Sequence, residues 1–261
     1  MATVTSSDGT KIGYTKIGTG HPLIIIDGAL CSRAFGPTPE IGKMLSKYFT
    51  VVNYDRRGRN ESTDTAPYSV DKEVDDIDAL IKEVGGPVHL LGFSSGAGLA
   101  LQAAARGLNI SKLVLYEPPY ITNMGGHTPP ADSVDQFKKM VSEGRRGDAV
   151  KFFMKDLVGM PAFVPVIMSL LPMWKKLKTS AHTLSYDASV MEGFTVPVKL
   201  ASQVKVPTFI MGGEKSALPL RNAVKKLSEV MPNSHLVILK GQNHNVSPKA
   251  LVPVVVEKLK N

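Results

Sequence analysis

The chain has few of the features that mark secreted, disulfide-rich or membrane proteins. Cysteine occurs once, at Cys31, so no disulfide can form within the chain and a cytoplasmic location is expected. The first residues, MATVTSSDGTKIGY, have no charged stretch followed by an apolar core, so no signal peptide is expected. The most apolar segment, residues 158–174, is shorter than a membrane span and contains Pro161, Pro165 and Pro172, so no membrane partner is expected.

Other absences narrow the range of ligands. The net charge is +8, but the lysines and arginines are scattered and form no basic stripe with interleaved aromatics, so nucleic acid is not an expected partner. No group of His, Cys, Asp and Glu has the spacing of metal ligands, so no metal is expected. The glycine-bearing turn GTGHP precedes a strand, whereas a dinucleotide-binding turn follows one, so we expect no cofactor.

The chain does contain short apolar runs that alternate with longer segments of helical periodicity. The runs are apolar almost throughout, which is typical of strands buried on both faces of a parallel sheet. Strands are expected at 22–27, 49–55, 87–93, 111–117, 206–213 and 235–241, and helices at 70–84, 95–107, 218–230 and 247–260. The first residues read as an antiparallel hairpin that turns at Asp8 and Gly9. This pattern predicts an α/β fold, a mostly parallel sheet flanked by helices.

One long segment departs from this alternation. Residues 121–204 contain no convincing strand and read as several helices rich in Met, Phe and Pro. We therefore expect an α/β core made of residues 1–120 and 205–261, with 121–204 inserted as a helical lid. Such a lid would cover the carboxyl ends of the strands, where open α/β sheets bind their ligands.

A short motif marks the junction between the strand at 87–93 and the helix that follows. Residues 92–96, GFSSG, fit the pattern G-x-S-x-G, with Ser94 in the middle position. The motif places a serine on a strained turn, and the flanking glycines let neighbouring backbones approach closely. The alternative is a helix start at which Ser94 or Ser95 acts only as an N-cap.

A serine nucleophile needs a base to remove its proton. The chain has six histidines, and His244 lies in the loop between the last strand and the last helix, at the sheet edge where Ser94 is expected. Taken by itself, a loop histidine is typical of a protein surface. Its position relative to Ser94 favours a catalytic base.

With these features the chain resembles the α/β-hydrolase superfamily over nearly its whole length. The resemblance rests on the strand series, the turn at Ser94, the helical insertion, the segment YDRRGRNES at 54–62, and His244 before the last helix. It implies a cofactor-independent hydrolase whose oxyanion hole consists of the backbone N–H groups of Ala29 and Ser95. Asp27 stands where the family has histidine, a change that backbone donors tolerate.

The acid of the expected catalytic triad departs from the family pattern. Most members carry an aspartate after the strand at 206–213, and Ser216 occupies that position here. Some members, lactone hydrolases among them, carry the acid at an earlier strand end, which here is Glu117. Glu117 is therefore the expected acid that orients His244 and stabilises its protonated form, with Glu214 as the alternative.

The expected reaction is cleavage of a carboxylic ester or lactone with an apolar body through an acyl-enzyme. Most Met and aromatic residues of the insertion are expected to pack against one another. Met173, Trp174, His182 and Tyr186 are the expected substrate contacts.

Other activities remain open. The same triad is compatible with carbon–carbon bond hydrolysis, perhydrolysis or a lyase step, and the fold is compatible with a non-catalytic ligand-binding protein. Arg56 and Arg57 are expected near the mouth of the site. The expected assembly is a monomer or a homodimer that acts on a small molecule.

Overall fold

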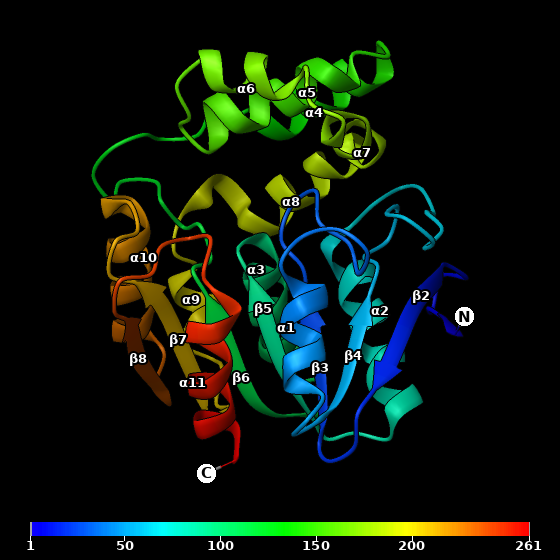
Figure 1. The fold of residues 1–261 in the computed structure, drawn as a ribbon, viewed down its shortest axis with the longest axis vertical. Helices are drawn as coiled ribbons and strands as arrows, with labels where there is room; N and C mark the ends of the chain where they lie inside the picture. Colours follow the sequence, from blue (N-terminus) through cyan, green and yellow to red (C-terminus); the bar gives the residue numbers. More distant parts are fainter. Residues whose placement is uncertain (1, 261) are drawn as a thin grey trace.

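A computed structural model describes residues 2–260, and its centre is a mostly parallel β-sheet (Figure 1). Within these residues the sheet has eight strands in the order β1-β2-β4-β3-β5-β6-β7-β8. The strands are β1 (Ala2–Thr5), β2 (Lys11–Ile17), β3 (Pro22–Ile26), β4 (Thr50–Tyr54), β5 (Val88–Phe93), β6 (Ile110–Tyr116), β7 (Thr208–Gly213) and β8 (Ser234–Leu239). The β1–β2 and β2–β4 pairs are antiparallel and the others are parallel. The expected α/β fold is confirmed.

Helices cover both faces of the sheet, which explains why its strands are apolar almost throughout. The helices are α1 (Thr38–Leu45) and α11 (Pro248–Lys260) on one face, and α2 (Val70–Val84), α3 (Ser95–Ala105) and α10 (Leu218–Val230) on the other. Strand β3 shows the consequence of the two-residue side-chain repeat. Leu23 and Ile25 belong to the core under α1 and α11, whereas Ile24 and Ile26 belong to the core under the other helices.

Helix α2 has clear start and stop signals and carries two acidic residues toward the core. The side chain of Ser69 accepts a hydrogen bond from the backbone at the start of the helix, and Gly85 ends the helix in the left-handed conformation with φ of 75°. Its buried apolar stripe consists of Val74, Ile77, Leu80 and Ile81. Glu73 and Asp76 are buried on the same side, so α2 directs two carboxylates into the protein interior.

Between β6 and β7, the described chain forms helices and connecting loops without strands. These elements are α4 (Ser133–Ser142), α5 (Arg146–Phe152), a π-helical turn (Phe153–Leu157), α6 (Phe163–Met168), α7 (Met173–Thr179), α8 (Leu184–Met191) and α9 (Val198–Ala201), with 3-10 turns at Ala181–Thr183 and Glu192–Phe194. Helices α4 to α7 form a layer beyond one edge of the sheet, and α8 lies between that layer and α3 (Figure 1). We refer to residues 121–204 as the helical insertion.

The most apolar part of the insertion is divided into short helices. Helix α6 has six residues, and Pro172 stands at the N-cap of α7. Across residues 2–260, no helix combines the length and the apolar character that crossing a bilayer requires.

The turn from β5 to α3 is crowded on both sides of Ser94. Ser94 has φ of 52° and ψ of −125°, an unusual backbone conformation for a residue with a side chain. A Cβ atom at position 92 would lie 2.5 Å from Gly96 O, and one at position 96 would lie 2.5 Å from Asp27 O. Glycine is therefore required at both positions, which agrees with the steric reason for the motif.

This crowding predicts a position-specific loss of stability. Gly96→Ala should lower the free energy of unfolding by about 2–3 kcal/mol, because the new methyl group meets backbone atoms that cannot move independently. The matched control is Gly147→Ala in α5, where a Cβ atom would be 3.8 Å from its nearest neighbours. The control should be neutral or stabilising by about 0.5–1 kcal/mol. Urea denaturation of both variants measures the difference, and equal effects would contradict this packing argument.

Candidate active site

Ser94 lies between the end of β5 and the loop that follows β3. Its backbone N–H donates to Tyr116 O of the neighbouring strand at 2.9 Å. A Cβ atom on Gly28 would lie 3.0 Å from Ser94 Cβ and 3.7 Å from Ser94 Oγ, so the Gly28 backbone passes directly beside the serine side chain. The Ser94 hydroxyl makes no N-cap hydrogen bond with α3, so the capping alternative for Ser94 is wrong.

Two backbone N–H groups adjoin Ser94, one from each side of the turn. Ala29 follows Gly28 in the β3 loop, and Ser95 is the first residue of α3. Neither N–H group has an acceptor among residues 2–260. Unpaired donors at a helix start and in a tight loop are suited to binding a negatively charged oxygen.

His244 contacts a buried carboxylate from a different part of the sheet. Its Nδ1 atom lies 2.8 Å from Glu117 Oε2. Glu117 follows β6 and its side chain is fully buried, while the His244 side chain is 39% exposed. The loop that carries His244 is held in place by Tyr116, whose hydroxyl donates to Asn243 O at 2.6 Å. The histidine therefore has one nitrogen engaged and a defined position.

The second oxygen of Glu117 is also fully engaged. Its Oε1 atom accepts hydrogen bonds from Gly213 N at 2.7 Å and from Ser216 Oγ at 2.5 Å. Ser216 is the residue that stands where most family members carry aspartate. Its hydroxyl donates to Glu117, a contact that the sequence did not suggest. The signal in the sequence is that Ser216 replaces the usual aspartate while a glutamate, Glu117, stands at the end of an earlier strand.

Glu214 does not take part in this group. It is exposed, and its Oε2 atom accepts a hydrogen bond from Gly241 N at 2.8 Å. Of the two acids considered from the sequence, Glu117 is the one that contacts His244.

Comparison with known proteins establishes the family. A model of the alpha/beta hydrolase family matches residues 18–254. The chain belongs to the alpha/beta hydrolase family. A structure of an alpha/beta hydrolase from Sphaerobacter thermophilus is 41% identical, with a TM-score of 0.91, covering 99% of this chain and 100% of that one.

Curated relatives of this hydrolase have diverse names. A non-heme haloperoxidase from Rhodococcus erythropolis is 24% identical over 266 residues, which cover 94% of this chain and 93% of the relative. An N-formylmaleamate deformylase from Pseudomonas putida is 32% identical over 156 residues, 57% of each chain. The family and its enzymatic relatives support a hydrolase, and their diversity leaves the substrate open.

Cys31 does not offer this hydrolase an alternative nucleophile to Ser94. Burial raises the pKa of Cys31 to about 12, so its thiol stays protonated at neutral pH and is a poor nucleophile. Across residues 2–260, no group of three or more His, Cys, Asp and Glu side chains is arranged to hold a metal ion.

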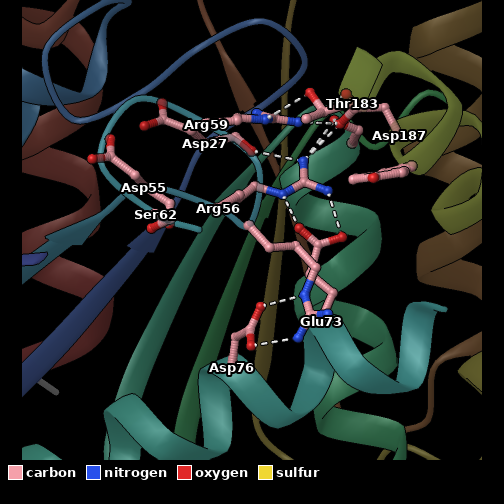
Figure 2. A network of polar contacts seen from close by, with 12 residues as sticks. Asp27, Asp55, Arg56, Arg59, Ser62, Glu73, Asp76, Thr183 and Asp187 are labelled. Carbon is pink, nitrogen blue, oxygen red and sulfur yellow. Dashed lines mark hydrogen bonds and ion pairs between the residues drawn. The ribbon is translucent and has the colours of Figure 1, made fainter. Parts of the chain in front are cut away.

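The arginines of YDRRGRNES are in the interior rather than at a pocket mouth, so that expectation was wrong. Arg56 and Arg57 are 1% and 0% exposed. Arg57 pairs with Asp76 of α2 at 2.7 Å and with Asp8 at 3.0 Å. Arg56 lies between Glu73 of α2, at 2.6 Å, and Asp187 of α8, at 2.7 Å (Figure 2). Paired carboxylates offset the cost of burying these charges.

The four expected substrate contacts fall into two groups. Trp174 is 7% exposed within the apolar core of the insertion, and Met173 packs against that core, so both act as packing residues in this structure. His182 and Tyr186 line a surface hollow of about 430 Å³ together with Tyr68. Within the described chain, the lining of this hollow includes neither Ser94 nor His244. The structure therefore does not bring these four residues together around Ser94.

Asp27, which replaces the family's histidine, is buried beside the Ser94 turn. Thr38 Oγ1 donates to both carboxylate oxygens, at 2.8 Å each. Burial raises the pKa of Asp27 to about 7, against the opposing effects of the Thr38 hydrogen bond and the charges of Arg59 and Arg56. Asp27 therefore changes its charge near neutral pH in the folded protein.

This raised pKa predicts a pH-dependent stability. Because the folded pKa is about 7 and the ordinary value is 3.8, Asp27 contributes stability that is complete below pH 3.8 and is lost as the pH rises through 7. Asp27→Asn should reduce the fall in unfolding free energy between these limits by up to about 4 kcal/mol. Urea denaturation at several pH values measures this, with exposed Asp71→Asn as the control. A pH profile identical to wild type would rule out the assignment.

Proposed function

We propose that this chain is a serine hydrolase that cleaves a carboxylic ester or lactone with an apolar body. The contact between His244 Nδ1 and Glu117 Oε2, at 2.8 Å, carries the proposal. A carboxylate on Nδ1 holds the imidazole in the tautomer whose Nε2 is free to accept a proton. Ser94, on the same edge of the sheet, is the group that would supply that proton.

In the proposed reaction, Ser94 Oγ attacks the substrate carbonyl carbon while His244 Nε2 takes the hydroxyl proton. The N–H groups of Ala29 and Ser95 stabilise the oxyanion of the tetrahedral intermediate, each by about 3–4 kcal/mol. The intermediate collapses to an acyl-enzyme as His244 gives its proton to the leaving alcohol. Water then attacks the acyl group, with His244 again accepting the proton, and releases the acid and free Ser94.

The charge distribution supports a neutral, apolar substrate. Arg56, Arg57 and Arg59 are each paired with buried carboxylates of the protein, so they are not free to bind an anionic substrate. The helical insertion adds an apolar core above the sheet. We infer that residues 121–204 act as the lid of an α/β core formed by 1–120 and 205–261, and that this lid covers the carboxyl ends of the strands, where the substrate binds.

Perhydrolysis is a second candidate, because two haloperoxidases are similar to nearly the whole chain. Besides the Rhodococcus protein, a non-heme chloroperoxidase from Streptomyces lividans is 27% identical over 97% of both chains. In this alternative, hydrogen peroxide replaces water in the attack on the acyl-enzyme and releases a peracid. The two reactions share every step up to the acyl-enzyme.

Substitution of the nucleophile tests the proposal. Ser94→Ala should lose nearly all turnover of short p-nitrophenyl esters, because no hydroxyl remains to form the acyl-enzyme, whereas Ser202→Ala at an exposed position should keep wild-type rates. Initial rates and labelling by a fluorophosphonate probe are the measurements. Wild-type turnover and labelling that persist in Ser94→Ala would contradict the proposal, and absence of both in wild type would favour a non-catalytic ligand-binding protein.

A further inference from the structure

The expected oxyanion donor Ala29 shares a peptide group with a carbonyl that is held from the protein interior. Gly28 O accepts a hydrogen bond from Arg59 Nη1 at 2.6 Å. Because a trans peptide is planar, its C=O and N–H point in opposite directions. The Arg59 guanidinium therefore sets the direction in which the Ala29 N–H points. Donation to the carbonyl also polarises the peptide group and strengthens its N–H as a donor.

Arg59 and a second buried arginine, Arg56, bind other carbonyls of the loop that follows β3. Arg59 Nη1 also donates to Cys31 O at 3.2 Å, and Arg56 Nη1 donates to Asp27 O at 3.3 Å. Leu30, between these anchors, has a positive φ of 62°, a conformation that is unfavourable for a branched side chain. The loop thus keeps an unfavourable shape because its carbonyls bind two buried guanidinium groups.

A single carboxylate from the helical insertion positions both arginines. Asp187 of α8 accepts hydrogen bonds from Arg59 Nη2 at 2.9 and 2.8 Å and from Arg56 Nη1 at 2.7 Å (Figure 2). Asp187 is 4% exposed. Burial by itself would raise the pKa of Asp187, but the charges of Arg59 and Arg56 outweigh burial and lower it, so the carboxylate is charged at neutral pH.

Asp187 also reaches the other side of the expected oxyanion hole. Its Oδ1 atom accepts a hydrogen bond of 2.7 Å from Ser95 Oγ, and Ser95 supplies the second expected N–H donor. The hydroxyl of Ser95 is thus tied to the same carboxylate that holds the arginine behind Ala29. The Ala29 donor is thus connected to Asp187 through Arg59, and the Ser95 donor belongs to a residue that contacts Asp187 directly.

We propose that Asp187 is a positioning residue that assembles the oxyanion hole, acting on Ala29 through Arg59 and on Ser95 directly. This inference rests on the proposed serine hydrolase function. It gives the insertion a role in the chemical step besides covering the substrate, because α8 carries the carboxylate that aligns both donors. Undocking of α8 would remove this alignment, so the site is complete only with the insertion in place.

Asp187→Asn removes the charge with little change in shape, and Asp76→Asn is its matched control. Asp76 is likewise a buried carboxylate paired with a buried arginine, but Arg57 does not contact the loop at 27–31 in the described structure. Kinetics with p-nitrophenyl acetate and inhibition by a trifluoromethyl ketone, which forms a tetrahedral adduct with an active serine, are measured on both variants. Circular dichroism and thermal unfolding establish that each is folded.

For Asp187→Asn we expect kcat to fall by about a hundredfold with KM nearly unchanged, and ketone affinity to fall in proportion to kcat/KM. Asp76→Asn should keep kcat and ketone affinity even if its melting temperature drops. Equal catalytic losses in the two variants, or wild-type kcat in folded Asp187→Asn, would overturn the inference.

Ser95→Ala keeps the experiment decisive if Asp187→Asn does not fold, because it removes only the hydroxyl. It should lower kcat by about tenfold and weaken ketone binding in parallel, and unchanged kcat would overturn the inference. Fluorophosphonate labelling of the wild type distinguishes failure of the positioning role from failure of the proposed hydrolase function. A labelled wild type with no Asp187 effect refutes only the positioning role, whereas a wild type that neither labels nor turns over substrate refutes the proposed function and this inference with it.

Discussion

A buried carboxylate at the end of β6 joins the parts of the chain on which the proposed chemistry depends. Glu117 is 0% exposed, and an ionised carboxylate at such a position is unstable unless its oxygens are hydrogen-bonded. Gly213 and Ser216 occupy one oxygen and His244 the other. Glu117 after β6 and Ser216 beyond β7 therefore belong to one hydrogen-bonded group. A hydroxyl at position 216 supplies a donor to Glu117 where most of the family has the acid itself.

A second buried carboxylate, Asp187 of α8, contacts Ser95, the residue that follows Ser94. Glu117 acts on the proposed base, whereas Asp187 contacts the groups that hold the proposed oxyanion donors. The two carboxylates come from different layers, one from the sheet and one from the helical insertion. In this account, the geometry around Ser94 depends on the sheet edge and the insertion being packed together.

The sequence predicts the fold well because its strands are buried on both faces and read as continuous apolar runs. Helix α2 was expected at 70–84 and is observed there, since a Ser cap and a Gly stop mark its ends. The choice between Glu117 and Glu214 needed the structure, because both follow strands at the same sheet edge. The burial of Arg56 was not predictable, because its partner Asp187 is 131 positions away and nothing local marks the pair.

The comparison of Glu117→Gln with Glu214→Gln tests most directly whether the acid of the proposed triad lies at the end of β6. Glutamine at 117 can present an N–H to His244 Nδ1 and favour the wrong tautomer, so kcat on p-nitrophenyl acetate should fall by about ten-thousandfold. Glu214→Gln, at an exposed site, should stay within a few-fold of wild type. A mild effect at Glu117 with a large loss at Glu214 would contradict the account.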